Sequence, residues 1–271
     1  MLRSLTLKAA QLTPTFVKNL VHKNRMLDRF SRKAFQGAMG ADGDIVTIES
    51  GPLAGVKLAV SEHISHAHVS GTYEAATQRA INSVLKPDYV CYDLGASIGY
   101  LSLLMAKRTR QVFAFEPAPH AQAEIRKHLA ANNLSNVTII PSPVSDCERT
   151  VEFSLTDNAY GSRITTAATD WPSLKLKTIT LDDFITTHPF PDFLKMDVEG
   201  EEGRVFEGAR SILKERKTIF CCELHSTEAA QHVERILHEF DYKIETLEGE
   251  PFVVADHITA GDVQVIAAPV A

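Results

Sequence analysis

The chain has 271 residues, of which 44% are hydrophobic and 23% charged, and its formal net charge at pH 7 is -6. These values are ordinary for a globular protein that buries a sizeable core, and the acidic balance argues against a nucleic-acid binder that relies on bulk electrostatic attraction. No apolar run approaches the roughly 18 residues that span a bilayer, and the four cysteines, which include no Cys-x-x-Cys pair, indicate reduced thiols and a cytoplasmic location.

Residues 1–43 are predicted to form a basic, amphipathic, helical extension. The first 27 residues contain five Lys or Arg side chains and no acid. Thr13 and Pro14 are typical of a helix start, and apolar side chains between Phe16 and Val21 recur on one helical face. We interpret this segment as a solvated helix packed on the main domain. Peripheral contact with an anionic membrane is the first alternative, and a cleaved transit peptide is the second.

Residues 44–271 are predicted to form a single domain, which begins with a β-hairpin and a helix within residues 44–86. Two strands within 44–62 flank the turn Gly-Pro-Leu-Ala-Gly, and a helix at 73–86 ends before Pro87. Apolar strands and helices then alternate, with strands at 90–94, 111–116 and 136–140 and helices at 99–107 and 119–132.

Residues 143–192 interrupt this alternation, and we interpret them as an insertion at the rim of the sheet, with extended segments at 151–155 and 176–181. The alternation resumes with strands at 193–196, 218–224, 242–247 and 263–268 and helices at 201–214 and 227–240. Strand–helix–strand units form right-handed crossovers and a parallel sheet. The sequence therefore predicts an α/β fold, a doubly wound, mostly parallel, Rossmann-like sheet of about seven strands.

A glycine turn, Asp-Leu-Gly-Ala-Ser-Ile-Gly, follows the first strand of the alternating unit. Its spacing differs from the Gly-x-Gly-x-x-Gly of dinucleotide-binding turns, whose phosphates disfavour a nearby carboxylate. It matches instead the acid-x-Gly-x-Gly-x-Gly turn of S-adenosylmethionine-dependent methyltransferases, with a serine at the middle glycine. A sulfonium and an ammonium group make an acid favourable here, and a residue without Cβ lets the backbone approach the cofactor. We therefore predict that S-adenosyl-L-methionine is bound by Asp93, Gly95, Ala96, Ser97 and Gly99.

A second carboxylate, Glu116, ends the next strand and is followed by Pro117. An acid about 20 residues beyond a glycine turn can accept hydrogen bonds from the hydroxyls of a ribose. The alternative is that Asp93 and Glu116 only cap strand ends, but the spacing of the two acids favours cofactor binding. The adenine end is expected at the loop after the third strand, which begins at Ser142.

Four stretches resemble the FkbM family of S-adenosylmethionine-dependent methyltransferases: GTYEAATQRAI (71–81), YDLGASIGYLS (92–102), TITLDDFI (178–185) and FLKMDVEGEEGRVFEGA (193–209). The run KMDVEG is the most distinctive. The resemblance implies the class I methyltransferase fold and methylation of hydroxyl groups on sugars, glycolipids or polyketides. It also implies that Tyr73 and Glu74 close over the cofactor, although by composition these two residues are only a helix start.

Two carboxylates of the KMDVEG run are catalytic candidates. Asp197 ends a strand and is expected to contact the cofactor and face its methyl group, and Glu199 lies in the following turn. The alternative is that these acids merely favour the start of the next helix through its macrodipole. We accept that interpretation for Glu201 and Glu202, and the resemblance favours a catalytic function for the other two.

The stretch CCELHS adds two more candidates. Glu223 and His225 alternate along a strand end, so their side chains are expected to point to one side. His225 is the best candidate for a general base, because an unperturbed imidazole titrates near neutrality. A helix-capping histidine is the alternative. A divalent cation held by these two residues with Asp197 and Glu199 is a further alternative that the sequence does not favour.

These observations predict an O-methyltransferase that acts on a hydroxyl of a carbohydrate, a glycolipid or a polyketide-like small molecule. The expected partner is a small molecule or a glycan, and not a nucleic acid. One alternative is a methyltransferase for a lipid or protein acceptor. Others are a nicotinamide-dependent oxidoreductase, which the turn spacing disfavours, and a cofactor-binding regulatory module that has lost catalysis.

Overall fold

The computed structural model describes residues 40–156, 161–165, 171–254 and 262–270, so the predicted extension falls almost wholly outside the described residues. The chain separates into two compact units, Met1–Ala75 with Lys127–Asn133 and Ala76–Arg126 with Leu134–Ala271. The predicted division into residues 1–43 and 44–271 stays a prediction. In the described part of the chain, no helix combines the length and the apolar character needed to cross a bilayer.

The first unit contains the predicted β-hairpin. Its strands, β1 (Ile45–Thr47) and β2 (Lys57–Ala59), pair antiparallel with Val46 opposite Leu58. Helix α4 (His66–Ser70) follows and ends at Gly71, whose φ of 79° is left-handed. A Cβ at Gly71 would overlap with the main-chain oxygen of Ser50, so both the conformation and the contact require glycine there.

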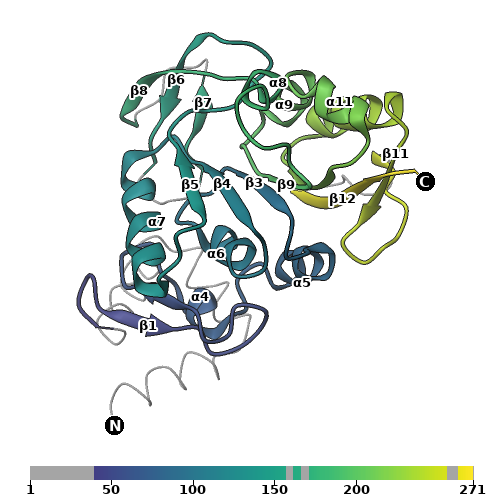
Figure 1. Ribbon diagram of the computed structural model, residues 1–271. Coiled ribbons are helices and arrows are strands. Elements are labelled where there is room, and N and C mark those ends of the chain that lie inside the picture. Colours follow the sequence, from purple (N-terminus) through teal and green to yellow (C-terminus); the bar gives the residue numbers. More distant parts are fainter. Residues whose placement is uncertain (1–39, 157–160, 166–170, 255–261, 271) are drawn as a thin grey trace. The chain divides into compact units, whose positions relative to one another are not determined.

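The second unit contains a seven-stranded sheet with the order β11-β12-β10-β9-β3-β4-β5 (Figure 1). All its pairs are parallel except those that β12 makes with β10 and β11. The predicted fold class is confirmed. The strands are β3 (Val90–Leu94), β4 (Gln111–Phe115), β5 (Val137–Ile140), β9 (Phe193–Met196), β10 (Ile219–Leu224), β11 (Tyr242–Thr246) and β12 (Val263–Pro269).

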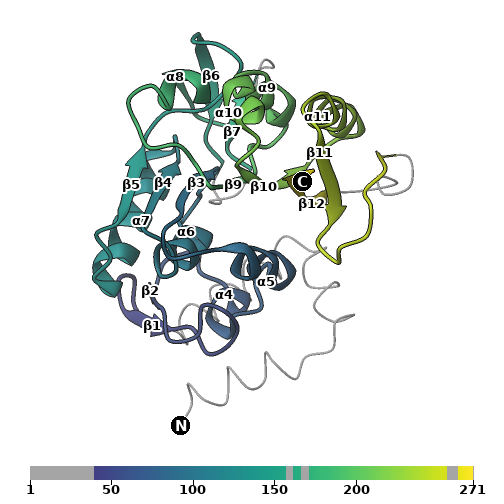
Figure 2. The same ribbon diagram turned by 45° about the vertical axis from the view of Figure 1, so that its right-hand side comes forward.

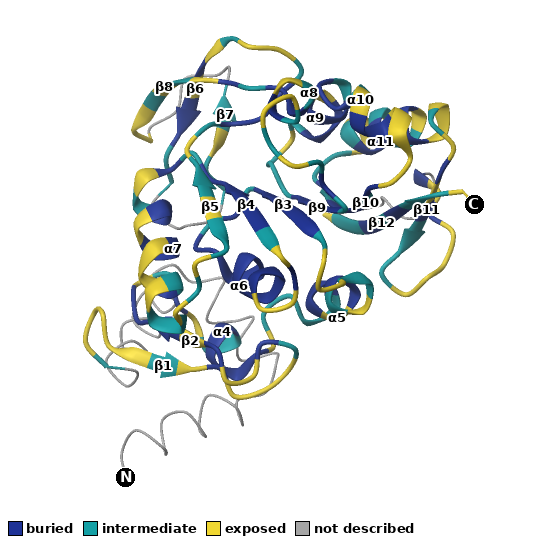
Figure 3. Cartoon of the chain, viewed as in Figure 1, coloured by how far each residue is buried: buried dark blue, intermediate teal, exposed yellow. Residues whose placement is uncertain are grey.

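Helices cover both faces of this sheet, as Figures 1 and 2 show. One face carries α5 (Ala75–Val84), α6 (Tyr100–Ala106) and the start of α7 (Pro119–Asn132). The other carries α8 (Leu181–Phe184), α9 (Glu202–Glu207), α10 (Arg210–Glu215) and α11 (Thr227–Glu239). Because both faces are covered, β3 is buried at every position, in keeping with its nearly continuous apolar sequence (Figure 3).

The sheet's alternating side chains build two different layers. Tyr92 and Leu94 face the large apolar core under α8 to α11, where the Tyr92 ring makes edge contacts with Phe113 and Phe184 at centroid distances of 5.5 and 5.4 Å. Asp93, between them in sequence, points to the opposite face, as side chains alternate along a strand. Apolar packing therefore fixes β3 from one side and leaves the other side to carry polar groups.

Two segments differ from the sequence-based expectation. The predicted helix at 201–214 is divided at Gly208 into α9 and α10, and the main-chain oxygen of Gly208 accepts a hydrogen bond from the amide of Asp182 at 2.9 Å. The predicted rim insertion contains a separate three-stranded antiparallel sheet with the order β7-β6-β8. Its strands are β6 (Thr150–Ser154), β7 (Arg163–Thr165) and β8 (Ser173–Lys177).

The order of the strands identifies where a ligand would bind. The chain runs outward from β3 through β4 to β5, and then returns to continue on the other side of β3 with β9 and β10. The sheet therefore changes direction between β3 and β9. Ligands of open α/β sheets bind beyond the carboxyl ends of the strands at such a point.

Candidate active site

The glycine turn lies at this switch point, between β3 and α6. The amides of Gly95 and Ala96 both donate to the main-chain oxygen of Phe115 at the end of β4, at 3.0 and 3.1 Å. Gly95 has a φ of 72°, and a Cβ on it would overlap with the main-chain oxygen of Asp197. Gly99 has a φ of 82° and is the N-cap of α6. The turn thus packs against the ends of two neighbouring strands, with no room for a side chain at Gly95.

Glu116 holds this turn to the end of β4. Its Oε2 accepts a hydrogen bond from the amide of Ser97 at 2.7 Å, and its Oε1 accepts one from the amide of Ala118 at 2.8 Å. Burial raises the pKa of this carboxyl to about 7, although the two amide hydrogen bonds act in the opposite direction. Each carboxylate oxygen has a further lone pair, so the group can still accept hydrogen bonds from a ligand.

A pocket enclosing about 430 Å³, part of it open to solvent, lies beside the turn. Five of the predicted cofactor-binding residues line it: Gly95, Glu116, Pro117, Ser142 and Asp197. Pro143 and Val144 lie in the loop where the adenine end is expected, and sequence reasoning missed the other lining residues, which are Leu94, Phe115, Phe153, Ser162, Ile164, Val198 and Glu201. Five of the lining residues, Pro143, Val144, Phe153, Ser162 and Ile164, belong to the rim insertion, and Phe153 and Ile164 lie on β6 and β7, so the small sheet contributes a wall of the pocket.

Asp93 does not line the pocket. Its side chain is buried; Oδ2 accepts a hydrogen bond from the Ser102 hydroxyl at 2.5 Å, and Oδ1 lies 3.6 Å from Nζ of Lys195. Nζ of Lys195 also donates to the main-chain oxygen of Gly95 at 3.0 Å and lies 3.5 Å from Oδ2 of Asp197. Lys195 and Ser102 thus both contact the Asp93 carboxylate, and direct binding of the cofactor by Asp93 stays a prediction.

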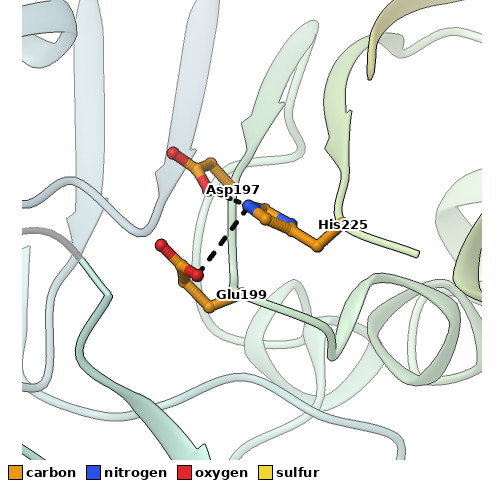
Figure 4. Close-up of side chains that lie close together, drawn as sticks. All are labelled: Asp197, Glu199 and His225. Atoms are coloured by element: carbon orange, nitrogen blue, oxygen red, sulfur yellow. Dashed lines mark ion pairs between the residues drawn. The ribbon is translucent and has the colours of Figure 1, made fainter. Parts of the chain in front are cut away.

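Asp197, Glu199 and His225 come together at the ends of β9 and β10 (Figure 4). Nε2 of His225 lies 3.3 Å from Oδ1 of Asp197 and 3.9 Å from Oε2 of Glu199. Glu199 has a φ of 56°, which is unusual for a residue with a side chain, and its Oε2 also lies 3.8 Å from Nη1 of Arg163 on β7. We call Asp197, Glu199 and His225 the acid–histidine cluster.

Glu202 contacts the other nitrogen of the His225 ring. Its Oε1 lies 2.8 Å from Nδ1 of His225 and accepts a hydrogen bond from the amide of Gly200 at 3.0 Å. The side chain is fully buried. This corrects the interpretation of Glu202 as an acid that only favours a helix start. Glu201 is also more than that, because it lines the pocket and its Oε2 accepts a hydrogen bond from the Ser145 hydroxyl at 2.8 Å.

These contacts change the ionisation of the cluster. Burial alone would lower the pKa of His225, but its hydrogen bonds to Asp197 and Glu202 outweigh burial and raise the pKa to about 11. Burial raises the pKa of Glu199, whereas for Asp197 the nearby Lys195 and His225 overcome burial and lower the pKa. The raised pKa favours the imidazolium form of His225 in this arrangement, and a role of His225 as a general base stays a prediction.

Glu223 lies beside the cluster, and its position is fixed by a chain of hydrogen bonds from residues of β12 and α5. Its Oε2 accepts a hydrogen bond from Nε2 of Gln264 at 2.7 Å, and Oε1 of Gln264 accepts one from the Thr77 hydroxyl at 2.5 Å. One carboxylate oxygen each of Glu223 and Asp262 and one ring nitrogen of His225 lie within 4.8 Å of one another. Glu223 and His225 are therefore close together, and Asp262 joins them without a signal in the sequence.

Tyr73 and Glu74 belong to the first unit. The Tyr73 ring stacks on the ring of His68 in α4, with centroids 4.1 Å apart, and Glu74 has a positive φ of 44°. Their role in closing over a cofactor stays a prediction.

Comparisons with known proteins extend this description. The family model described as the methyltransferase FkbM domain matches residues 93–244, a range that includes the glycine turn and the KMDVEG run and confirms the resemblance noted in the sequence. The hexuronic acid methyltransferase AglP of Haloferax volcanii is 25% identical to this chain over 154 residues, which are 56% of this chain and 62% of that protein. The chain thus spans less than two thirds of the length of this curated relative.

Two solved structures are also similar. Methyltransferase FkbM from Methylobacillus flagellatus KT is 17% identical, with a TM-score of 0.47, and the match covers 74% of this chain and 53% of that one. Precorrin-6y C5,15-methyltransferase from Geobacter metallireducens GS-15 is 16% identical, with a TM-score of 0.45, and the match covers 72% of this chain and 87% of that one.

Proposed function

The chain belongs to the methyltransferase FkbM domain family, whose model matches more than half of it, and from this premise we propose that it transfers a methyl group from S-adenosyl-L-methionine to a hydroxyl group of a carbohydrate. Membership makes the chain a methyltransferase and sets aside the oxidoreductase alternative. Three parts of this proposal need support: the residues that bind the cofactor, the identity of the acceptor and the role of the acid–histidine cluster.

The pocket beside the glycine turn fits the cofactor. Gly95 lines the pocket with main-chain atoms alone, Glu116 beside Pro117 would accept hydrogen bonds from the ribose hydroxyls, and the apolar side chains of Val144, Phe153 and Ile164 would suit the adenine ring. Three carboxylates, Glu116, Asp197 and Glu201, line the pocket. This negative lining favours a cationic cofactor and disfavours a pyrophosphate. When bound, S-adenosyl-L-methionine would supply the electrophilic methyl group.

The observation that carries the proposal is the double position of Asp197. It lines the pocket, and it is also a member of the acid–histidine cluster. A hydroxyl that approaches the cluster would therefore come close to a methyl donor in the pocket. The residues of the chain would hold the acceptor oxygen there and exclude water, which is the positioning that methyl transfer requires.

The acceptor hydroxyl must also lose its proton, since a neutral hydroxyl is a poor nucleophile. The pKa of His225 is raised by Asp197 and Glu202, which favours the cation, so we do not assign the base to the imidazole in this arrangement. The carboxylates of Asp197 and Glu199 are then the groups that favour loss of the proton. Glu199 is the better matched of the two, because its pKa is raised.

A sugar acceptor is supported by the relative from Haloferax volcanii, which is described as a hexuronic acid methyltransferase. The site of this chain offers a group that would suit an acidic sugar. Arg163 extends from β7 to within 3.8 Å of Glu199, and its side chain is 57% exposed. A guanidinium in this position could pair with a carboxylate on the acceptor.

The experiment that tests the proposal is methyl transfer from methyl-labelled S-adenosyl-L-methionine to matched oligosaccharides that end in a glucuronic acid or a glucose. We expect label in the sugar as an ether, which survives mild alkali. Label released by alkali would place the methyl group on the sugar's carboxyl group instead. Labelling of lipid or protein acceptors, with none on the carbohydrates, would contradict the proposed acceptor class.

A further inference from the structure

We propose that Asp197, Glu199 and His225 form a binding site for one divalent transition-metal cation such as Mn²⁺. The existence of this site is independent of the acceptor, whereas the role of the cation rests on the function proposed above. The sequence alone does not favour a metal at these residues, and it is their geometry that supports one.

The three side chains present one imidazole nitrogen and two carboxylate oxygens toward a common point (Figure 4). These atoms all lie within 4.8 Å of one another, and Nε2 of His225 lies 3.3 Å from one carboxylate and 3.9 Å from the other. Neighbouring ligands of a cation with bonds of about 2.1 Å are about 3 Å apart. Small side-chain movements would therefore complete three positions on one side of an octahedral cation and leave the others for water or substrate.

The support behind His225 is a second, independent observation. Glu202, which is fully buried, accepts a hydrogen bond from Nδ1 of the ring at 2.8 Å. This contact keeps a proton on Nδ1 and directs Nε2 toward the two carboxylates, and a bound cation would displace the proton that Nε2 carries in the imidazolium form. A carboxylate behind a histidine is the usual support of a metal-bound imidazole. The amide of Gly200 donates a hydrogen bond to the same Glu202 oxygen at 3.0 Å, so the position of Glu202 is itself fixed by the main chain.

The local charge also favours a cation. Around His225 lie the carboxylates of Asp197, Glu199 and Glu202, and those of Glu223 and Asp262 are close by. Besides the protonated His225, which a metal would replace as the positive partner, the cations that these acids face are Lys195, which is shared with the buried Asp93, and Arg163, which is 57% exposed. A divalent cation would offset this negative charge. One imidazole with two carboxylates suits Mn²⁺ better than Ca²⁺, which prefers oxygen ligands alone.

In the proposed reaction the cation would take over the activation assigned above to the carboxylates. It would bind the acceptor's hydroxyl oxygen and lower the pKa of the hydroxyl, as a Lewis acid does. The O–H bond would break with its proton passing to water, the O–C bond to the methyl group would form, and the C–S bond would break with its electron pair remaining on sulfur. Asp197 would belong both to the metal site and to the cofactor pocket, because it lines that pocket as well.

The test is a titration of the whole, chelator-treated protein with Mn²⁺, followed by the electron paramagnetic resonance signal of free Mn²⁺. The wild type is expected to bind one Mn²⁺ per chain. Glu199→Gln is expected to lose this binding and to keep S-adenosylhomocysteine binding, because Glu199 does not line the pocket. Glu202→Gln is expected to weaken Mn²⁺ binding by about tenfold or more. Retained binding of S-adenosylhomocysteine also shows that each variant is folded.

Two control variants make the result specific. Glu248→Gln with Glu250→Gln removes two exposed acids from a turn after β11 and is expected to leave Mn²⁺ binding unchanged. Asp262→Asn distinguishes the proposed site from a second possible one, formed by Glu223, His225 and Asp262. This variant is also expected to retain Mn²⁺ binding.

Three outcomes would overturn the inference: no Mn²⁺ binding by the wild type, equal binding by Glu199→Gln, or binding lost only in Asp262→Asn. In the first case the cluster is an ion-paired histidine only. Binding of S-adenosylhomocysteine without Mn²⁺ rejects the metal and leaves the proposed function standing. Binding of Mn²⁺ at these residues without S-adenosylhomocysteine supports the metal site and rejects the proposed function.

Discussion

Gly95 and Asp197 are in direct backbone contact: a Cβ on Gly95 would overlap with the main-chain oxygen of Asp197. The first residue lies in the turn after β3, and the second follows the neighbouring strand β9. Both line the pocket. The contact therefore sets the distance between the glycine turn and the acid–histidine cluster, and it explains why a residue without a side chain stands at position 95.

Gly95→Ala should abolish binding of S-adenosylhomocysteine and lower the melting temperature, because the new methyl group must push the end of β9 away. Gly249→Ala is the matched control, since Gly249 has a similar φ of 87° but nothing within 4 Å of an added Cβ. The control should cost only the strain of the left-handed conformation, about 1–2 kcal/mol, and should keep the affinity. Calorimetric titration and thermal unfolding of both variants would decide this. Equal behaviour of the two would show that the contact is unimportant.

Lys195→Met should destabilise the fold by about 3–5 kcal/mol, because it leaves the buried carboxylate of Asp93 without its cation. The Lys195 side chain is only 8% exposed and also faces Asp197. Urea denaturation measures the loss. Adding Asp93→Asn to Lys195→Met should restore part of it.

The control for this loss is Lys177→Met, since Lys177 is 66% exposed and its pair with Glu148 lies at the surface. It should cost less than about 1 kcal/mol. A loss at Lys195 as small as at Lys177 would contradict the account of a buried charge network.

Glu116 should make stability depend on pH in an unusual direction for an acid. Its pKa is raised from 4.5 to about 7 in the folded chain. Between these values the folded state holds a proton that the unfolded chain has released, so the free energy of unfolding falls as the pH rises through the window and levels off above it. As the pH rises through this window, the free energy of unfolding of the wild type should therefore fall by on the order of 3 kcal/mol relative to that of Glu116→Gln. Denaturant titrations from about pH 5 to pH 8 would measure it, and a constant difference would reject the shifted pKa.

Arg163→Gln should lower kcat/KM for a glucuronic acid acceptor by about tenfold, since a charged hydrogen bond contributes about 1.5–3 kcal/mol. Turnover of the matched glucose acceptor and binding of S-adenosylhomocysteine should not change. Lys175→Gln, on the same small sheet with a side chain that is 79% exposed, is the control and should affect neither acceptor. A loss that is equal for both sugars would mean that Arg163 supports the site and does not recognise a carboxylate.

The sequence predicted the parts of this molecule that local patterns determine. Strands β3 and β9 and helix α7 have the predicted bounds, and Gly95, Glu116 and Asp197 meet at one pocket. Parallel strands bring their carboxyl ends to one edge, so residues that end strands converge without further information.

The partners of these residues could not be predicted in the same way. Asp93 and Lys195 face each other because β3 and β9 pair in register with these two residues opposite, and the sequence does not say which strands are neighbours. For the same reason the sequence does not reveal that Glu202 contacts His225. Only the packing of α9 against the end of β10 reveals that Glu202 is buried against the imidazole and changes its ionisation.

The measurement that tests the central claim most directly is calorimetric titration of the full chain with S-adenosylhomocysteine and, separately, with NAD, with Glu116→Ala as the control. The account predicts that S-adenosylhomocysteine binds with one site per chain, that NAD does not bind, and that Glu116→Ala loses the affinity. Absence of binding by S-adenosylhomocysteine, or clear binding of NAD, would contradict it.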